Sequence, residues 1–335
     1  MQSGGTLIGQ GIYGCTFDPA PPCAGGSVFK KSHNTDVGKI LSDDPNAELA
    51  IGKAIMSLPL ASAYFALPSA SCTPQMPVLD PDAKGCRVLT ESGKGTKFSM
   101  LLMPDGGLPI IKYAQDQNRL VKNYKRIFIH LLEGGAIYQN AGYVHNDIHM
   151  GNILVDDAGV ARYIDFGLAF RTDSVKTWGD SNLGTEFKPK YFMQAPEVHA
   201  WRMYLGGIRL ADGVSILKEL HPEYRQMEQQ FPTRKDAVTA LRDLMIHEAH
   251  DSGALFIRKY AKKFDSWRIG LCMWLFWNDM LMSGIMTGIT PLYQERDLIR
   301  SVLSGLTEFD PRKRLTMTEA LHILDPNNRM ASLTP

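Results

Sequence analysis

The sequence lacks the features that would place it at once in several large classes of protein. It has no excess of one charge, because 36 Lys and Arg residues are balanced by 35 Asp and Glu residues, for a formal net charge of +1. This balance argues against a generally basic nucleic-acid-binding protein and against an acidic disordered chain. Internal repeats and low-complexity tracts are also missing, which argues against a solenoid. We therefore expect a soluble globular protein that does not bind nucleic acid.

Cysteine is scarce and widely spaced. The five cysteines lie at positions 15, 23, 72, 86 and 272, and no Cys-x-x-Cys pair occurs. An odd number of cysteines at wide spacing predicts that there is no disulfide framework and that the compartment is reducing. The alternative is a zinc site formed by Cys23, Cys72 and Cys86. We expect reduced cysteines and a cytoplasmic location.

No long stretch is free of polar residues. The most apolar region, residues 269–293, carries Asn278 and Asp279 in its middle and Pro291 near its end. An Asp in the middle of a membrane costs about 2.5–3.5 kcal/mol, so a buried core helix is the better interpretation. Residues 1–7 contain no basic region followed by an apolar run, and we expect no signal peptide. The sequence thus predicts no membrane association.

The 335 residues are enough for about two domains. The first third is rich in Gly, Pro and Ser, and its short apolar runs predict strands at residues 7–17, 37–41 and 98–103. A strong turn at residues 104–107 predicts a hinge. Beyond it, apolar residues recur at helical spacing from Leu120 to Leu132. This pattern predicts an α+β fold, with a small β-rich part, a larger helical part and a cleft at their junction.

A glycine-rich stretch follows the first apolar residues. It reads Gly9-Gln10-Gly11-Ile12-Tyr13-Gly14, and glycines at this spacing let backbone N–H groups approach phosphate oxygens without Cβ clashes. Dinucleotide-binding folds share the pattern, but there a helix follows the loop. Here the chain runs on to Phe17 and then Asp18-Pro19, which predicts a strand and a turn. Two interpretations remain, a phosphate-covering loop and a simple glycine-rich hairpin.

The strongest motif combines two polar clusters at the ends of apolar runs. His145, Asp147 and Asn152 form the pattern H-x-D-x-x-x-x-N, and Asp165-Phe166-Gly167 follows a second apolar run. Phosphoryl transfer requires a group that orients the attacking hydroxyl and oxygen ligands for Mg²⁺. Asp147 suits the first role, and Asn152 and Asp165 suit the second because they carry hard oxygen donors. One Asp near a Gly would indicate only a turn, but the joint pattern predicts phosphoryl transfer.

These motifs resemble the signature set of the eukaryotic-type protein kinases. Further signatures follow in the order of that family: Val37-Gly38-Lys39-Ile40 around the lysine that pairs ATP phosphates, Ala195-Pro196-Glu197 at the end of the activation segment, Asp265-Ser266-Trp267 at the start of the buried central helix, and Asp310 with Arg314, whose partner would be Glu197. The resemblance covers residues 8–324. The short glycine-rich loop and the Met-Pro-Asp-Gly-Gly hinge are most similar to serine/threonine-protein kinases of large nucleocytoplasmic DNA viruses.

The resemblance implies a two-lobed protein kinase-like fold. Residues 1–105 would form a small β-rich lobe, and residues 106–335 a larger α-helical lobe with an inserted helical segment at about residues 203–263. The implied activity is ATP- and Mg²⁺-dependent phosphoryl transfer to a protein hydroxyl, with Ser or Thr favoured because such kinases are the commoner class. If the protein is viral, we expect it in the cytoplasm of the host cell or packaged in the virion.

Site residues follow from the same resemblance. The catalytic residues would be Asp147, Lys39, Asn152 and Asp165, of which Asn152 and Asp165 would bind the metal. The nucleotide-binding residues would be Gly9, Gln10, Gly11, Ile12, Gly14, Lys39, Glu48, Leu101 and Met103. Glu48 is chosen as the helix partner of Lys39 because Ile51 and Ile55 follow it at helical spacing. Only nine positions separate Glu48 from Lys39, fewer than is usual in the family, and the alternative is a solvent-facing Glu48.

Two departures from the family bear on regulation and substrate. Asn146 stands where many members have the Arg that pairs with a phosphorylated activation segment, so we expect activity without that phosphorylation. His149 stands two positions after Asp147, where Ser/Thr kinases usually have Lys, and this resembles small-molecule kinases of the aminoglycoside and choline type. The alternatives are therefore a small-molecule kinase and a non-catalytic nucleotide-binding scaffold.

Overall fold

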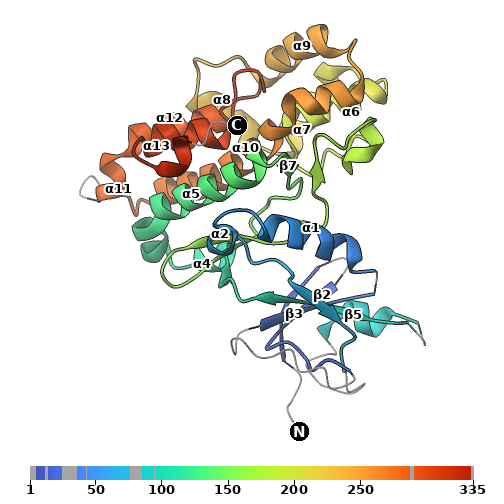
Figure 1. Cartoon of the computed structure of the whole chain (residues 1–335). Helices are drawn as coiled ribbons and strands as arrows, with labels where there is room; N and C mark the ends of the chain where they lie inside the picture. The colour runs from blue at the N-terminus through green and yellow to red at the C-terminus, as the bar shows by residue number, and fades with distance from the viewer. Residues whose placement is uncertain are drawn as a thin grey trace. The chain divides into compact units, whose positions relative to one another are not determined.

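The structure is a computed structural model that describes residues 5–11, 14–24, 36–42, 44–75, 85–93, 96–286 and 290–332. Ile12, assigned above to nucleotide binding, lies outside the described residues. Two compact units divide the chain: an amino-terminal unit of Met1–Gly107 with Tyr163–Gly167, and a carboxy-terminal unit of Leu108–Arg162 with Leu168–Pro335. The first is β-rich and the second largely helical (Figure 1), which confirms the α+β class. The kinase fold and its lobe boundaries remain predictions.

A five-stranded antiparallel sheet forms most of the amino-terminal unit. Its strands are β1 (Thr6–Gln10), β2 (Gly14–Asp18), β3 (Asp36–Leu41), β4 (Ala70–Cys72) and β5 (Ser99–Pro104), in the order β1-β2-β3-β5-β4. Helices α1 (Asn46–Met56), α2 (Ala61–Tyr64) and α3 (Arg87–Glu91) belong to the same unit. The strand expected over residues 7–17 is in fact two strands, because the chain turns where Gly11 N–H donates to Gly14 O at 2.8 Å.

The two faces of this sheet differ in character because side chains alternate along each strand. One face packs into a core that contains Cys15, Phe17, Ile40, Met100 and Leu102. Residues directly opposite each other in an antiparallel pair share a face, and Lys39 is opposite Thr16 on β2 and Leu101 on β5. Lys39 therefore lies on the face away from this core.

Two disulfide bonds cross-link the amino-terminal unit. They join Cys15 to Cys86 and Cys23 to Cys72, so the prediction of reduced cysteines is wrong, and the zinc alternative fails because its ligands are oxidised. The odd number of cysteines did not exclude disulfides, because four of them pair and the fifth, Cys272, is a free cysteine buried in helix α10. The argument from cysteine usage to a reducing compartment therefore loses its basis.

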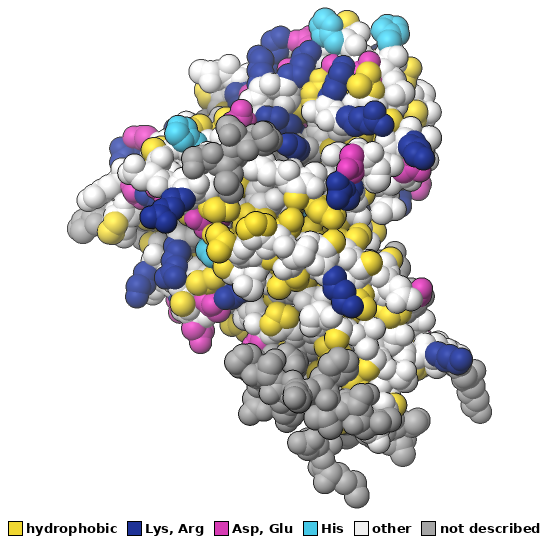
Figure 2. Space-filling model, viewed as in Figure 1, with side chains coloured by type: hydrophobic (Ala, Val, Ile, Leu, Met, Phe, Trp, Pro, Cys, Tyr) yellow, Lys and Arg dark blue, Asp and Glu magenta, His cyan; other side chains and the backbone are white. Residues whose placement is uncertain are grey.

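Helices dominate the carboxy-terminal unit. They are α4 (Ile110–Tyr113), α5 (Gln117–Asn140), α6 (Pro196–Leu205), α7 (Leu210–Leu220), α8 (Glu223–Gln230), α9 (Ala237–Glu248), α10 (Gly253–Met282), α11 (Pro291–Gln294), α12 (Arg296–Leu306) and α13 (Met317–Leu324), with 3₁₀ turns at Trp178–Ser181 and Arg329–Ser332. Strands β6 (Leu108–Pro109), β8 (Ile153–Val155) and β9 (Ala161–Tyr163) form one small sheet, and β7 (Tyr143–Val144) pairs with β10 (Phe170–Arg171). Lys and Arg side chains are interspersed with Asp and Glu on the visible face of this unit (Figure 2).

Helix α10 is the longest helix in the described part of the chain, and most of its side chains are buried in the core. It begins after Ser252, whose side chain accepts a hydrogen bond from Leu255 N–H at 3.2 Å. Asp265 therefore lies in the middle of α10, and its predicted position at the helix start is wrong. Trp267 and Trp274 on α10 are fully buried, as the core-helix interpretation predicted. Across the described ranges, no helix combines the length and apolar character that a membrane span needs.

A buried ion pair ties α6 to the segment before α13. Arg314 donates from both terminal nitrogens to the two carboxylate oxygens of Glu197, at 2.6 and 2.8 Å, and both side chains are fully buried. This confirms the pair expected from the motif. The region at about residues 203–263 is helical, with buried apolar residues on α7 and α9; its status as an insertion remains a prediction.

Candidate active site

The face of the amino-terminal sheet that carries Lys39 also carries two other predicted nucleotide-binding residues, Leu101 and Met103. On β3 and β5, Lys39 is opposite Leu101, and Val37 is opposite Met103. These four side chains share one face because two positions separate them along each strand. Leu101 is fully buried and Met103 is half-buried. The face thus combines one ammonium group with an apolar surface.

Lys39 is held between two carboxylates. Its Nζ donates to Glu48 Oε1 and Oε2 at 2.9 and 3.0 Å and to Asp165 Oδ2 at 3.1 Å. Glu48 comes from the first turn of α1, and Asp165 comes from the segment Tyr163–Gly167, which belongs to the same unit. The exposed fractions of the three side chains are 16% for Lys39, 13% for Glu48 and 36% for Asp165. Asp165 is therefore the most accessible of the three.

Burial and charge act against each other in this cluster. Burial lowers the pKa of Lys39, but the carboxylates of Asp165 and Glu48 outweigh it and leave the pKa above its usual value. Burial raises the pKa of Glu48, and Asp165 adds to this, while Lys39 opposes it. Lys39 therefore stays positively charged at neutral pH.

The glycine-rich turn lies at the edge of the same sheet. Gly9 is opposite Thr16 and so shares the face of Lys39, whereas Gln10 is opposite Cys15 on the core face. The side chain of Gln10 is directed at Gly85 and Arg87: its amide nitrogen donates to Gly85 O at 2.6 Å, and its amide oxygen accepts from the guanidinium group of Arg87. Only the backbone of Gln10 therefore remains for the predicted nucleotide contact. At Gly14 a Cβ atom would lie 2.6 Å from Ile40 O, so no other residue fits without a shift.

The Asp165 segment has an unusual backbone conformation. Asp165 has a φ of 59°, in the left-handed region that, glycine apart, mainly asparagine and aspartate adopt. Its Oδ1 accepts from Gly167 N–H at 3.3 Å. Phe166 is buried with its ring edge-on to Phe65 at 5.8 Å, and Ala66 N–H donates to Tyr163 O at 3.1 Å. Packing on both sides of Asp165 thus holds its conformation.

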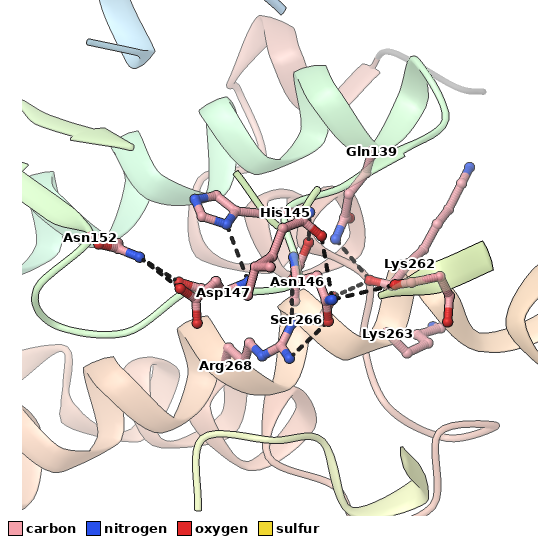
Figure 3. Close-up of polar contacts among 12 residues, drawn as sticks. Gln139, His145, Asn146, Asp147, Asn152, Lys262, Lys263, Ser266 and Arg268 are labelled. Carbon is pink, nitrogen blue, oxygen red and sulfur yellow. Dashed lines mark hydrogen bonds and ion pairs between the residues drawn. The ribbon is translucent and has the colours of Figure 1, made fainter. Parts of the chain in front are cut away.

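In the carboxy-terminal unit, helix α10 anchors the loop that carries Asp147. The buried carboxylate of Asp265 accepts from His145 N–H at 2.7 Å and from Asn146 N–H at 3.1 Å. Arg268 donates to Asp265 at 3.0 Å and to Asn146 Oδ1 at 3.1 Å, and it reaches toward the loop in Figure 3. Asn146 has a φ of 65° and is 5% exposed. The amide nitrogen of Asn146 also donates to Leu168 O at 3.4 Å and to Ser181 O at 3.5 Å, so Asn146 links the loop to the segment that carries these two residues through neutral hydrogen bonds.

Asp147 and Asn152 lie side by side at the two ends of this loop (Figure 3). The amide nitrogen of Asn152 donates to Asp147 O at 2.9 Å and to Asp147 Oδ2 at 3.3 Å. His149 Nδ1 accepts from Gly151 N–H at 3.0 Å, and His149 Nε2 lies 3.9 Å from Asp147 Oδ2. That distance is too long for a hydrogen bond. His149 thus faces the carboxylate of Asp147 without binding it directly.

Tyr191 is a site residue that the sequence analysis missed. Its hydroxyl donates to Asp147 Oδ1 at 2.6 Å, the shortest described contact of that carboxylate. The two residues are 44 positions apart, and neither motif includes Tyr191. The sequence carries no signal for this contact, because the contact depends on how the segment after Gly184 folds back onto the loop.

The donor set suits Mg²⁺. The amide nitrogen of Asn152 is used toward Asp147, which leaves the amide oxygen as the atom to face a cation, and Asp165 is the more accessible carboxylate of its cluster. Carboxylate and amide oxygens are ligands that Mg²⁺ accepts. Among the described residues, no group of three or more His, Cys, Asp or Glu side chains could hold a metal ion by itself, so Asn152 and Asp165 each offer an oxygen donor within their own unit rather than a complete site.

Comparisons with known proteins find partial matches to protein kinases. No family model matches the chain. A stretch of 63 residues, 17% of this chain, is 41% identical to the serine/threonine-protein kinase SSK22 of Saccharomyces cerevisiae. A stretch of 127 residues, 35% of this chain, is 25% identical to the serine/threonine-protein kinase cst-1 of Caenorhabditis briggsae. These matches span 5% and 25% of the relatives' own lengths. The chain thus has partial similarity to protein kinases.

Proposed function

We propose that the protein transfers a phosphoryl group from ATP to a hydroxyl of a protein substrate, with Ser or Thr as the acceptor. The observation that carries the proposal is the ammonium group of Lys39, shared by Glu48 and Asp165 at 2.9 and 3.1 Å. A fixed lysine beside a metal-binding carboxylate is what phosphate binding requires. The partial similarity to serine/threonine-protein kinases supports the same reaction.

Each residue has a defined role in the proposed reaction. Lys39 binds phosphate oxygens of ATP, Glu48 holds Lys39 in place, and backbone N–H groups of the glycine-rich turn cover the phosphates. Asp147 orients the acceptor hydroxyl and receives its hydrogen bond. Bound Mg²⁺, with Asn152 and Asp165 as its protein ligands, would neutralise charge on the phosphates. These roles divide the work between a phosphate-binding cluster and an acceptor-binding loop.

His149 favours a second candidate, a kinase of small molecules. Its Nε2 faces Asp147 at 3.9 Å, in a position where a lysine would carry a permanent charge. A protein substrate is preferred because Glu197 and Arg314, from motifs typical of protein kinases, form their buried pair. The cytoplasmic location and the viral relationship remain predictions within this proposal.

The first prediction concerns Asp165. The Asp165→Asn variant should lose phosphoryl transfer by about a hundredfold or more, because an amide replaces a charged metal ligand, while the protein still folds. The assay uses labelled ATP, Mg²⁺ and a panel of generic proteins, and circular dichroism checks the fold.

Asp157→Asn is the matched control, since the Asp157 side chain is 99% exposed on the surface and should leave the rate unchanged. Equal turnover in the Asp165 and Asp157 variants would refute the kinase proposal. Labelling of aminoglycosides or choline, with no labelling of protein, would favour the second candidate.

A further inference from the structure

In the described part of the chain, the side-chain hydrogen bonds that hold the carboxylate of Asp147 come from neutral donors. Of its two carboxylate oxygens, Oδ2 accepts from Asn152 at 3.3 Å and lies 3.9 Å from His149, while Oδ1 accepts from the Tyr191 hydroxyl at 2.6 Å. A hydrogen bond to an ionised carboxylate at this length is strong. Tyr191 therefore makes the dominant fixed contact with this carboxylate.

Tyr191 is itself firmly held. Its carbonyl oxygen lies 3.2 Å from the Nε2 of the fully buried His199 and accepts from Gln194 N–H at 3.2 Å. Its own N–H donates to Lys188 O at 3.2 Å. Burial raises the pKa of Tyr191, and Asp147 adds to this, so the phenol stays protonated and remains a donor. A side chain fixed in this way is suited to hold another group in place.

We propose that Tyr191 is the positioning residue for Asp147 in phosphoryl transfer, and that its hydroxyl orients the carboxylate toward the acceptor. The inference rests on the proposed function. A carboxylate oxygen has two lone pairs, so Asp147 Oδ1 can accept from Tyr191 and from an acceptor hydroxyl at the same time. Tyr191 acts only through Asp147, and it replaces the electrostatic support that a lysine at position 149 would supply.

The test removes one oxygen atom. In Tyr191→Phe the ring is retained, and we expect kcat to fall about ten- to hundredfold, as for loss of a hydrogen bond to a charged group. The KM for ATP should stay within about twofold, because Lys39 and the glycine-rich turn are untouched. Incorporation of 4-aminophenylalanine at position 191, which keeps a donor, should recover part of kcat. The matched control is Tyr204→Phe. Tyr204 lies on α6 and is 51% exposed, so this variant should behave as wild type.

The outcomes separate this inference from the proposed function. Absence of transfer in the wild-type protein would overturn both. If the wild-type protein is active and Asp165→Asn is not, a kcat of Tyr191→Phe within twofold of wild type overturns the inference alone. A rise in kcat overturns it too, because Tyr191 would then be an inhibitory contact, and so does phosphate found on Tyr191 by mass spectrometry, because it would then be an acceptor.

Discussion

At the scale of single residues, the charged side chains of Lys39 and Asp147 have different kinds of partner. Lys39 shares its charge with Glu48 and Asp165 in a partly buried cluster. Asp147 instead accepts hydrogen bonds from the neutral side chains of Tyr191 and Asn152. Removal of Glu48 would leave a partly buried ammonium short of a partner, which is costly. In the proposed reaction, the neutral donors at Asp147 would orient the carboxylate and leave its charge available to an acceptor hydroxyl.

His199 gives a prediction on the pH dependence of stability. Burial lowers its pKa to about 3, and the positive charges of Arg202 and Arg268 act in the same direction, against the hydrogen bond to Tyr191 O. The unfolded state, with an ordinary histidine pKa of about 6.5, binds the proton first. Stability from the neutral His199 is therefore complete above about pH 6.5 and is lost as the pH falls toward 3, by up to about 1.4 kcal/mol per pH unit.

The measurement is urea unfolding at several pH values. His199→Gln should show a shallower loss of the free energy of unfolding between about pH 6.5 and pH 4 than the wild-type protein. His322→Gln, at an exposed position on α13, should keep the wild-type slope. Identical slopes in all three proteins would mean that His199 is accessible to protons in the folded state.

How far the site could be predicted depends on the sequence distance between its parts. The partnership of Lys39 and Glu48 could be inferred because apolar residues at helical spacing follow Glu48 and fix which face of α1 is buried. The contact of Tyr191 with Asp147 could not, since it depends on the path of a long irregular segment. The side-chain direction of Gln10 was equally hidden, because it depends on the register between β1 and β2.

At the scale of elements, helix type was easier to predict than helix ends. The long apolar stretch indicated the buried body of α10, but the helix starts at Gly253, in a short stretch of residues 249–253 where helical periodicity is weak. The glycines of residues 9–14 indicated a loop, yet the flanking strands seemed continuous by hydropathy alone. A pair of strands appears only once Gly11 and Gly14 close the turn.

Helix α9 provides a test of whether the segment at about residues 203–263 is core. Leu244 is fully buried, and α9 packs against α6 and α7. Leu244→Ala should lower the free energy of unfolding by about 2–5 kcal/mol, because it leaves a cavity. Ile246→Ala, on the same helix but 63% exposed, should change it by less than about 0.5 kcal/mol. Equal effects in chemical denaturation would show that this face of α9 is not packed.

At the scale of the whole molecule, the two units are stabilised differently. The amino-terminal unit has a small sheet and two disulfide bonds that close loops of 71 and 49 positions. The carboxy-terminal unit relies on a large helical core, and burial raises the pKa of its one cysteine, Cys272, to about 12. Sequence could not reveal this division, because a cysteine count carries no information on which strands lie next to each other.

The disulfides give the last prediction, which concerns where the molecule weakens under reducing conditions. Each bond restricts the unfolded chain and is worth about 4 kcal/mol for loops of this length. Reduction should therefore destabilise the amino-terminal unit by several kcal/mol, and hydrogen exchange should rise in β2 and β4 but not in α10 or α12. Cys272→Ser is the control, since it should show the same response to reductant. Alkylation of the unfolded, unreduced protein should label one cysteine of the five; labelling of all five would refute the cross-links.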